Sequence, residues 1–447
     1  MQNFSSNILF WQWVLIIGSS LILLFISPVA RTVSDFFKAT TRSNKPPGLW
    51  LLTSSLVISW IFAKSITNAA NLGLKYGIVG GVAYATYYLS FLFAGIIIYQ
   101  LRVKGGYTSI HHFLKEKFGK TALIIFSILI AFRLFNEVWS NTMVIGSYFG
   151  SIGSNQYYLA ILSFTVLTLL YSLKGGLKSS LFTDAIQVIL FGGLLILLLG
   201  VIVPKSDGPI SMLTSGSWTM EGGVDLLLVA LVQIFSYPFH DPVMTDRGFI
   251  TNPNTMRKAF FLAVPIGFLA IILFSLIGVY ASQLGLAGQA AVEVGKTLGI
   301  VSMLAINFIM ITSASSTLDS AFASFSKLGV MDLSIGSQSV SNGRLIMIVI
   351  AIMGTIPVFF DPEILSATTI SGTMVVGLAP IFLLWKMRVR KIAFSFSVLI
   401  GVVFGVWYAI GAYPDELIFF SGDYGALLSV NLLGTITCFL IYLSCKK

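Results

Sequence analysis

A run of hydroxyl side chains lies within one long apolar segment of this sequence. Between Ile309 and Leu328 the chain reads IMITSASSTLDSAFASFSKL, inside an apolar stretch that covers about residues 299–328. At helical spacing, four polar side chains of this run share one face; they are Thr312, Ser315, Ser316 and Asp319. Such a stripe in a membrane helix either allows close helix packing or supplies the oxygen ligands that a hard cation prefers. The stripe alone favours packing, so other residues must decide.

One carboxylate bears directly on that choice. Asp184 lies in KGGLKSSLFTDAIQ, about four residues into another apolar segment. It could cap a helix near the interface, because it lies only about 6 Å beyond Ser180 at the helical rise of 1.5 Å per residue. An ionisable residue within a membrane segment is, however, functional by default. Together with Ser315 and Ser316, Asp184 would complete an oxygen cage for a small monovalent cation.

Three further ionisable residues fall at membrane depth. Arg133 and Glu137 are four residues apart in one apolar segment, so they can pair on one helix face. That pair could simply neutralise itself, or it could line a solute path. Lys64 lies far from either end of its own segment, where it could extend towards the interface or face a cavity with Glu137 as its partner. If all three face a cavity, the site suits a polar or zwitterionic solute.

The composition places these residues in a membrane protein. The 447 residues are 56% hydrophobic and 10% charged, whereas soluble domains carry about 25% charged residues. The net charge of +10 does not indicate nucleic-acid binding, because Lys and Arg fall in alternate loops, as the positive-inside rule predicts. We therefore expect the lipid bilayer, and no nucleic acid, as a partner of this chain.

The apolar segments predict thirteen transmembrane helices of an all-α protein. The loop after the first segment carries Arg31, Lys38, Arg42 and Lys45, which places the N-terminus outside and the C-terminus in the cytoplasm of a cell (inner or plasma) membrane. The segment 247–258 is assigned to a cytoplasmic loop on the same rule. The expected spans cover residues 8–28, 48–72, 79–101, 121–149, 156–173, 180–203, 225–246, 258–283, 299–328, 342–359, 364–386, 391–412 and 424–445.

Two of these spans look discontinuous. The span 48–72 is rich in Ser, Thr and Asn, and the span 225–246 contains Pro238 and Pro242, which break the helix ladder. Two five-helix repeats of opposite orientation, each opening with a broken helix, would match the architecture of secondary transporters. Two kinked helices without an ion site are the alternative. The predicted units are 1–47, with one extra helix; 48–203, the first repeat; 204–224, an outer loop; 225–386, the second repeat; and 387–447, with two further helices.

Three stretches resemble the solute:sodium symporter family. YSLKGGLKSSLFTDAIQ is similar to its loop-to-helix signature, SASSTLDSAFASFSKL to its eighth core helix, and DPVMTDRGFITNPNTMRKA to the arginine-bearing end of its sixth core helix. The resemblance covers about residues 30–390 and implies the leucine-transporter fold with 5+5 inverted repeats. The stretch SWIFAKSITNAANLGLKYGIVGG also resembles the urea/polyamine branch. Members of that branch usually have a small, uncharged residue at the position of Lys64 in this chain.

The resemblance implies two sodium sites, while the residues themselves provide the candidates for a solute site. The shared sodium site would use the carbonyls of Ile58, Ile61 and Ile309 and the hydroxyls of Thr312 and Ser313. The second sodium site, found in some members, would use Asp184, Ser315 and Ser316. For the solute, our candidates are the polar and charged residues at the two breaks and on the Arg133 face: Lys64, Ser65, Asn68, Arg133, Glu137, Gln233 and His240.

The resulting hypothesis is a secondary active transporter that couples sodium to the symport of a small polar organic solute by alternating access, with Na⁺ as the required ion. The alternatives are a proton-coupled or sodium-independent transporter of the same fold, in which Lys64 replaces a sodium charge, and a non-transporting solute sensor. The sequence ends at Lys447, directly after the last expected span, which argues against a sensor with a signalling domain. We find no P-loop, metal cluster or nucleophile–base set, so we do not expect an enzyme. Asp319 is expected to bond within the helix bundle.

Overall fold

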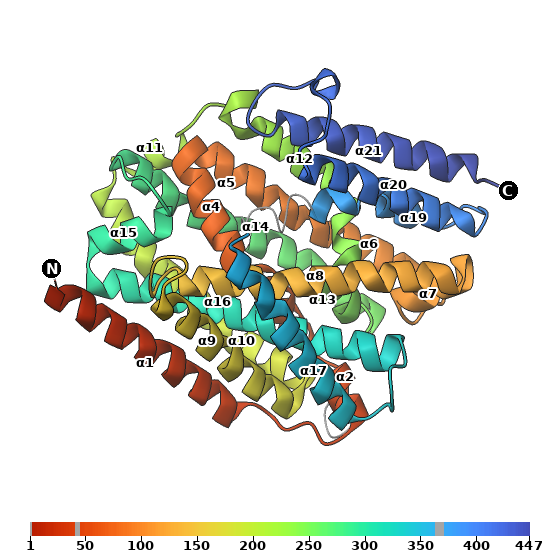
Figure 1. Cartoon of the computed structure of the whole chain (residues 1–447), viewed down its shortest axis with the longest axis horizontal. Helices are drawn as coiled ribbons and strands as arrows, with labels where there is room; N and C mark the ends of the chain where they lie inside the picture. Colours follow the sequence, from red (N-terminus) through yellow and green to blue (C-terminus); the bar gives the residue numbers. More distant parts are fainter. Residues whose placement is uncertain (1, 41–44, 363–370) are drawn as a thin grey trace.

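The computed structural model describes residues 2–40, 45–362 and 371–447, and these residues are almost entirely helical. The long helices that cross the molecule singly are α1 (Gln2–Ile26), α8 (Lys120–Gly146), α9 (Asn155–Gly175), α10 (Leu177–Ile202), α14 (Pro253–Gln283), α16 (Ile300–Lys327), α17 (Val340–Thr355), α20 (Ile392–Ala409) and α21 (Gly425–Ser444). Figure 1 shows α1 along one edge of the bundle, α20 and α21 along the opposite edge, and α8 and α16 through the middle.

Shorter helices complete or connect these elements. One further crossing is built from α5 (Ile78–Ala85), the 3₁₀ turn η1 (Thr86–Leu89) and α6 (Ser90–Val103). The connecting helices are α2 (Val33–Lys38), α7 (Ile110–Phe118), α11 (Pro209–Leu213), α15 (Ala290–Leu298) and α19 (Leu378–Leu383), with the short turns η2 (Val203–Lys205), η3 (Met220–Val224), η5 (Leu328–Asp332), η6 (Ile356–Phe360) and η7 (Asp415–Leu417). Local sequence sets several of these boundaries: Ser109 caps α7 by accepting a hydrogen bond from the His112 amide.

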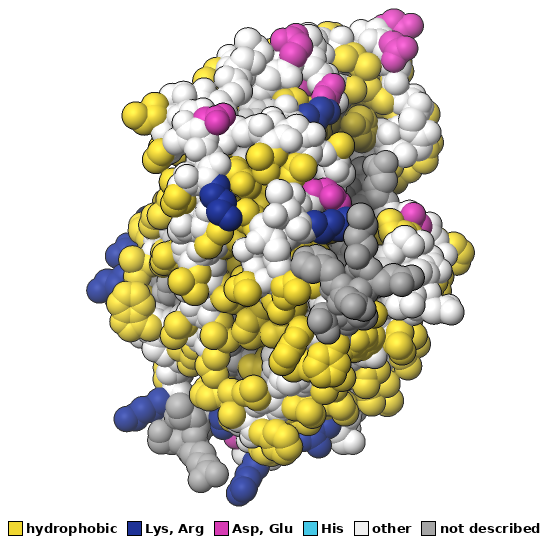
Figure 2. All heavy atoms as spheres, turned by 90° about the vertical axis from the view of Figure 1, so that its left-hand side faces the viewer, with side chains coloured by type: hydrophobic (Ala, Val, Ile, Leu, Met, Phe, Trp, Pro, Cys, Tyr) yellow, Lys and Arg dark blue, Asp and Glu magenta, His cyan; other side chains and the backbone are white. Residues whose placement is uncertain are grey.

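The predicted count of thirteen spans is not confirmed. Within the described residues, ten continuous helical segments are long and apolar enough to cross a membrane, and one bent pair makes an eleventh. The predicted span at 364–386 begins outside the described residues, and its described part contains one helical turn at 371–374 and the short α19. The predicted span at 225–246 is divided into three short elements, which are too short to count singly. Hydrophobic side chains cover much of the face in Figure 2, as a lipid-facing surface requires.

Both segments predicted to be discontinuous are broken. In the first, α3 (Leu49–Trp60) and α4 (Ala63–Tyr76) meet at an angle of 58°. Between them Ile61 and Phe62 leave the helical conformation, with ψ angles of 70° and 149°. In the second, α12 (Asp225–Gln233) is followed by η4 (Tyr237–His240) and α13 (Pro242–Arg247), with a proline at the start of each of the two later elements. Each break leaves backbone polar groups without helical partners at membrane depth.

Close packing holds the broken α4 against α14. A Cβ atom on Gly278 of α14 would lie 1.7 Å from the Ala70 carbonyl oxygen, and one on Gly73 would lie 2.1 Å from the Ser275 carbonyl oxygen. Glycine therefore lets the two backbones approach each other, which is the usual role of small residues between membrane helices. The close helix packing that was one expectation for the hydroxyl stripe of α16 is found here at the contact between α4 and α14.

We predict that Gly278→Ala lowers the melting temperature of the purified protein. The added methyl group must push α14 from α4, and overpacking of this kind costs about 1–3 kcal/mol. Gly193→Ala is the matched control, because Gly193 lies in α10 with no atom within 4 Å of an added Cβ. There the same substitution should gain up to about 1 kcal/mol of helix propensity. Equal melting temperatures for the two variants would contradict the proposed contact.

Candidate functional site

The hydroxyl stripe of α16 faces the break between α3 and α4. The Ser313 hydroxyl donates a hydrogen bond to the Ile61 carbonyl, which the break has released from the helix ladder. One residue earlier, the Thr312 hydroxyl lies 2.8 Å from the Ile309 carbonyl oxygen. Four of the five expected ligands of the shared sodium site are thus in contact with one another. Ser313 of α16 meets Ile61 at the break, and Thr312 meets Ile309 within α16. Ile58, the fifth, is fully buried in the last turn of α3.

The donor set at this break suits a sodium ion. All five groups offer neutral oxygen atoms, carbonyl or hydroxyl, and hard cations prefer such ligands. Within the described ranges, no cluster of three His, Cys, Asp or Glu side chains could hold a metal ion. The neutral oxygen ligands at the break favour a hard monovalent cation.

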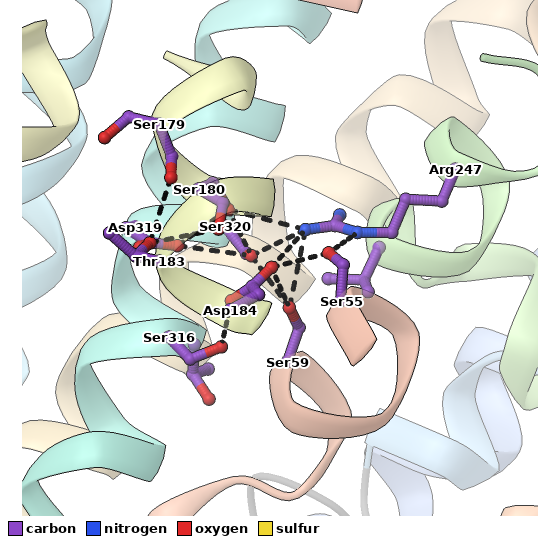
Figure 3. Close-up of polar contacts among 12 residues, drawn as sticks. Ser55, Ser59, Ser179, Ser180, Thr183, Asp184, Arg247, Ser316, Asp319 and Ser320 are labelled. Atoms are coloured by element: carbon purple, nitrogen blue, oxygen red, sulfur yellow. Dashed lines mark hydrogen bonds and ion pairs between the residues drawn. The ribbon is translucent and has the colours of Figure 1, made fainter. Parts of the chain in front are cut away.

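Asp184 lies at the centre of a second polar cluster, which Figure 3 shows between α3, α10, α13 and α16. One of its carboxylate oxygens, Oδ2, accepts hydrogen bonds from Ser55 at 2.5 Å and Ser59 at 3.2 Å, both on α3. The other oxygen, Oδ1, accepts from Ser316 on α16. Asp184 is fully buried, so it does not cap a helix at the interface.

Arg247 enters the same cluster from α13. Its Nη2 lies 3.5 Å from Asp184 Oδ2, and its Nε donates to the Ser55 hydroxyl at 2.6 Å. The arginine is fully buried, so its assignment to a cytoplasmic loop is wrong. Figure 3 shows the guanidinium group reaching from α13 into the serine side chains of the other three helices. The positive-inside rule misplaced Arg247 because it counts charge along the chain and does not detect a buried partner.

The expected second sodium ligands are only partly assembled. Ser316 meets Asp184, but the Ser315 hydroxyl accepts a hydrogen bond from Gln187, one turn further along α10, at 2.7 Å. Asp319, expected to bond within the bundle, accepts from Ser180 at 2.7 Å and from Thr183 at 2.9 Å. A second buried carboxylate thus lies beside the Asp184 cluster.

A network of four charges connects the two broken helices. The Lys64 Nζ atom at the start of α4 lies 2.8 Å from Glu137 Oε1 on α8. Arg133, one turn earlier on α8, also pairs with Glu137 and contacts Asp241 Oδ2 at 3.1 Å. All four side chains are at most 5% exposed. Because two cations meet two anions, the network is formally neutral, which lowers the cost of burying it.

The uncharged residues among the candidates for solute binding make a separate set of contacts. Ser65 and Asn68 on α4 lie 3.2 and 3.3 Å from the Tyr84 hydroxyl of α5. Gln233, the last residue of α12, accepts a hydrogen bond from Tyr87 at 2.9 Å and donates one to Asn431 at 2.9 Å. A cavity of about 440 Å³ opens beside Asn68. These residues provide neutral hydrogen-bond donors and acceptors next to the charged network.

His240 lies between the two sets. Its Nδ1 is 2.6 Å from the Tyr237 carbonyl oxygen, and its ring packs edge-on against the Tyr237 ring at 4.8 Å. Its Nε2 is buried and has no hydrogen-bond partner among the described residues. The Arg133 guanidinium lies over the same Tyr237 ring at 5.2 Å. Tyr237 therefore links His240 to the charge network.

Sequence reasoning missed several residues that complete these clusters. Arg247 and Asp241 supply the counter-charges of Asp184 and Arg133, and Trp60 donates to Asp241 at 2.9 Å. The signal available for Asp241 was its position between Pro238 and Pro242 in a broken span. Nothing in the spacing of the sequence indicates that Arg247 would turn inward.

Comparison with known proteins agrees with this geometry. Residues 43–223 match the model of the sodium:solute symporter family. The predicted resemblance to that family is confirmed. Matches in mouse include solute carrier family 5 member 4A, 30% identical over 161 residues, covering 36% of this chain and 24% of the relative. The mouse sodium/myo-inositol cotransporter 2 is 27% identical over 193 residues, covering 41% of this chain and 26% of the relative.

A match outside mammals is longer. The probable urea active transporter 3 of Schizosaccharomyces pombe is 24% identical over 259 residues, covering 51% of this chain and 37% of the relative. The chain therefore spans between a quarter and two fifths of the length of these symporters. The members matched are transporters and not enzymes.

Solved structures show the fold over nearly the whole chain. The substrate-bound, outward-open structure of a Na⁺-coupled sialic acid symporter matches with a TM-score of 0.65 at 19% identity, covering 98% of both chains. MhsT in complex with L-phenylalanine matches with a TM-score of 0.60 at 13% identity, covering 90% of this chain and 99% of MhsT. The chain thus has the all-helical, leucine-transporter-like fold of these symporters.

We predict that Glu137→Gln strongly destabilises the protein. The substitution leaves Lys64 without a counter-charge, and breaking a buried ion pair in this way costs about 3–5 kcal/mol. Glu293→Gln is the matched control, because Glu293 pairs with Lys296 at 2.7 Å on the exposed end of α15 and such pairs contribute about 0–1 kcal/mol. Thermal melting in detergent measures both. A Glu137 variant as stable as the Glu293 variant would disprove the network.

Proposed function

We propose that this protein is a sodium-coupled symporter for a small polar organic solute. The observation that carries the proposal is the meeting of the α16 hydroxyls with the carbonyls released at the α3–α4 break. Sodium at Ile58, Ile61, Ile309, Thr312 and Ser313 would hold α3 and α16 together, and its departure would let them separate. A ligand that binds one state better shifts the population towards that state, and this is how the ion gradient would drive alternating access.

The repeat arrangement belongs to the same proposal. Residues 48–203 and 225–386 would form two inverted repeats, opened by the α3–α4 break and the α12–α13 break, in a fold of thirteen spans. The start of α1 and the end of α21 lie at opposite ends of the molecule in Figure 1. That supports an outside N-terminus and a cytoplasmic C-terminus in a cell membrane.

The solute would bind between the two breaks. We assign its contacts to the charge network of Lys64, Arg133 and Glu137 and to the neutral groups of Ser65, Asn68, Gln233 and His240. Because the network is already balanced with Asp241, a neutral or zwitterionic polar molecule would leave the buried charge unchanged. The relatives of this chain, a probable urea active transporter and a sodium/myo-inositol cotransporter among them, support a polar and uncharged solute.

The proton-coupled alternative requires Lys64 to supply the charge of the shared sodium ion. Lys64 instead makes its ion pair with Glu137 on α8, and its Nζ lies 5.0 Å from the centre of the Phe62 ring. The Ser313 hydroxyl meets the Ile61 carbonyl directly. These contacts favour sodium at the shared site, with Lys64 in the solute network.

We predict that Ser313→Ala abolishes sodium-dependent stabilisation of the purified protein. The experiment compares melting temperatures in sodium and in potassium, across urea, polyols, sugars, amino acids and carboxylates. A ligand at 100 times its Kd stabilises by about 2.7 kcal/mol, which is readily measured. A solute that stabilises only in sodium would identify the substrate class and the coupling ion together.

The control for this variant is Ser324→Ala. Ser324 is a buried serine of the same helix whose hydroxyl has no hydrogen-bond partner among the described residues. It should keep the full response to sodium. Normal sodium-dependent stabilisation and uptake in the Ser313 variant would disprove the assignment of the shared site.

A further inference from the structure

Basic side chains line a hollow at the end of the molecule that carries the C-terminus. The hollow has a volume of about 620 Å³ and lies between the end of α6, helix α7, the connection from α19 to α20 and Lys447. Figure 1 places α7, that connection and the C-terminus at the same end of the bundle. Five cationic side chains and one carboxylate line the hollow: Lys104, Lys117, Lys386, Arg388, Lys447 and Glu116. Segments far apart in the sequence thus bring positive charge to one place.

The positive charges of this hollow have no carboxylate partners within the described residues. None of the five cations forms an ion pair there, and the Glu116 carboxylate lies 3.3 Å from His112 Nε2 instead. Lys117 is partly buried, and its Nζ donates a hydrogen bond to the Trp385 carbonyl. Burial lowers the pKa of Lys117 to about 8. An anion in the hollow would therefore meet cations that the protein does not neutralise.

Backbone contacts hold two of these cations next to each other. The Lys447 amide donates to the Arg388 carbonyl at 3.1 Å, and the Arg390 amide donates to the Cys445 carbonyl at 2.8 Å. The two segments therefore run antiparallel side by side. Like charges on neighbouring segments repel each other, so this pairing brings together charges that an anion between them would stabilise.

The positive-inside rule explains why basic residues occur in these loops, but not why they converge on one hollow. Lys115, Lys120 and Lys258 lie in the same predicted cytoplasmic loops, yet they are exposed and do not line the hollow. The loops thus contain two groups of basic residues, one dispersed over the surface and one gathered around a cavity. The gathered group has the arrangement of a binding site for an anion.

The surroundings of the hollow favour a lipid over a soluble anion. Tyr107 and Trp385 line it beside the basic residues, and such aromatic side chains typically lie at the membrane interface. Leu383, two residues before Trp385, lines a second hollow of about 410 Å³ between α12 and α21. The side chains that line this second hollow are apolar apart from Thr435. A headgroup at the basic hollow would therefore have an apolar surface nearby for an acyl chain.

We propose that the basic hollow binds the phosphate of an anionic phospholipid of the cytoplasmic leaflet, with Lys117, Lys386, Arg388 and Lys447 as its contacts. Basic pockets between membrane helices on the cytoplasmic side recognise headgroups of this kind. The phosphate would connect α7 to the α19–α20 connection and to the C-terminal segment. The inference rests on the proposed orientation, with the C-terminus in the cytoplasm, and it is independent of the sodium coupling.

The test titrates the delipidated full-length protein in detergent with phosphatidylglycerol and counts bound lipids by native mass spectrometry. The wild type should bind about one phosphatidylglycerol tightly, and phosphatidylcholine with the same acyl chains should bind weakly. The triple variant Lys386→Gln, Arg388→Gln and Lys447→Gln should bind phosphatidylglycerol on the order of 100-fold more weakly. Each Lys or Arg near an anionic headgroup contributes about a five-fold factor in affinity.

The matched control is the triple variant Lys115→Gln, Lys120→Gln and Lys258→Gln. It removes the same charge from the same predicted face but leaves the hollow intact, so its Kd should change by less than about three-fold, since distant exposed charges are screened. Melting without lipid identifies a variant that fails to fold. Lys447→Gln alone is the milder second variant, at an exposed position, and it should lose about five-fold in affinity.

Three results would overturn the inference. Equal losses in the two triple variants would mean that the charge of the whole face, and not the hollow, attracts the lipid. Equal binding of phosphatidylcholine would mean that the headgroup charge is not recognised. Inorganic phosphate that displaces phosphatidylglycerol at a similar concentration would assign the site to a soluble anion. The Lys386, Arg388 and Lys447 variant should keep the sodium-dependent stabilisation of the wild type, so that the proposed function fails or holds separately.

Discussion

The structure depends on the pairing of charges that have no water to solvate them. Arg133, Glu137, Asp184, Asp241 and Arg247 lie inside the bundle, and the Arg247–Asp184 pair is fully buried at 3.5 Å. Two unit charges 4 Å apart interact by about 4 kcal/mol at the effective dielectric of protein sites. Each of these side chains therefore restricts the helices that carry it, because separating a pair leaves an uncompensated charge in the membrane.

Three such pairings involve the broken helices. The α3–α4 break brings Lys64 to the network on α8, and the α12–α13 break brings Asp241 to Arg133 and Arg247 to Asp184. In a continuous helix, Lys64, Asp241 and Arg247 would point in other directions and would not reach these partners. The breaks consequently do two things at once: they free carbonyl oxygens for an ion, and they turn charged side chains towards partners on other helices.

Much of this arrangement could be predicted from the sequence, and the reason is that its signals are local. The hydroxyl stripe of α16 follows from helical spacing, the two breaks follow from polar and proline content, and the Arg133–Glu137 pair follows from a separation of four residues. Asp184 was identified because a carboxylate in an apolar segment is rare. The count of thirteen spans stays unconfirmed where the segments are short or broken, since hydropathy measures length and composition rather than continuity.

The sequence anticipated two contacts between distant segments, Lys64 with Glu137 and Asp184 with Ser316, but not the others. Arg247 reads as one more basic residue beside a loop, and only the fold places it against a carboxylate 63 positions earlier. Ser315 and Ser316 look equivalent on a helical wheel, yet one faces Gln187 and the other faces Asp184. Side-chain choice between two nearby partners depends on the facing helix, and spacing along one helix carries no information about it.

The contacts between α3 and α16 extend from the helix break to the Asp184 cluster. Ser313 meets the Ile61 carbonyl at the break, while about two turns away Ser320 lies 3.0 Å from Ser59. Ser59 in turn donates to Asp184, the partner of Arg247. The sodium site that we propose at the break and the Arg247–Asp184 pair therefore lie along the same interface between α3 and α16. Separation of α3 from α16 would disrupt both. An ion at the proposed site would stabilise the closed interface and, with it, the contacts of the charged pair.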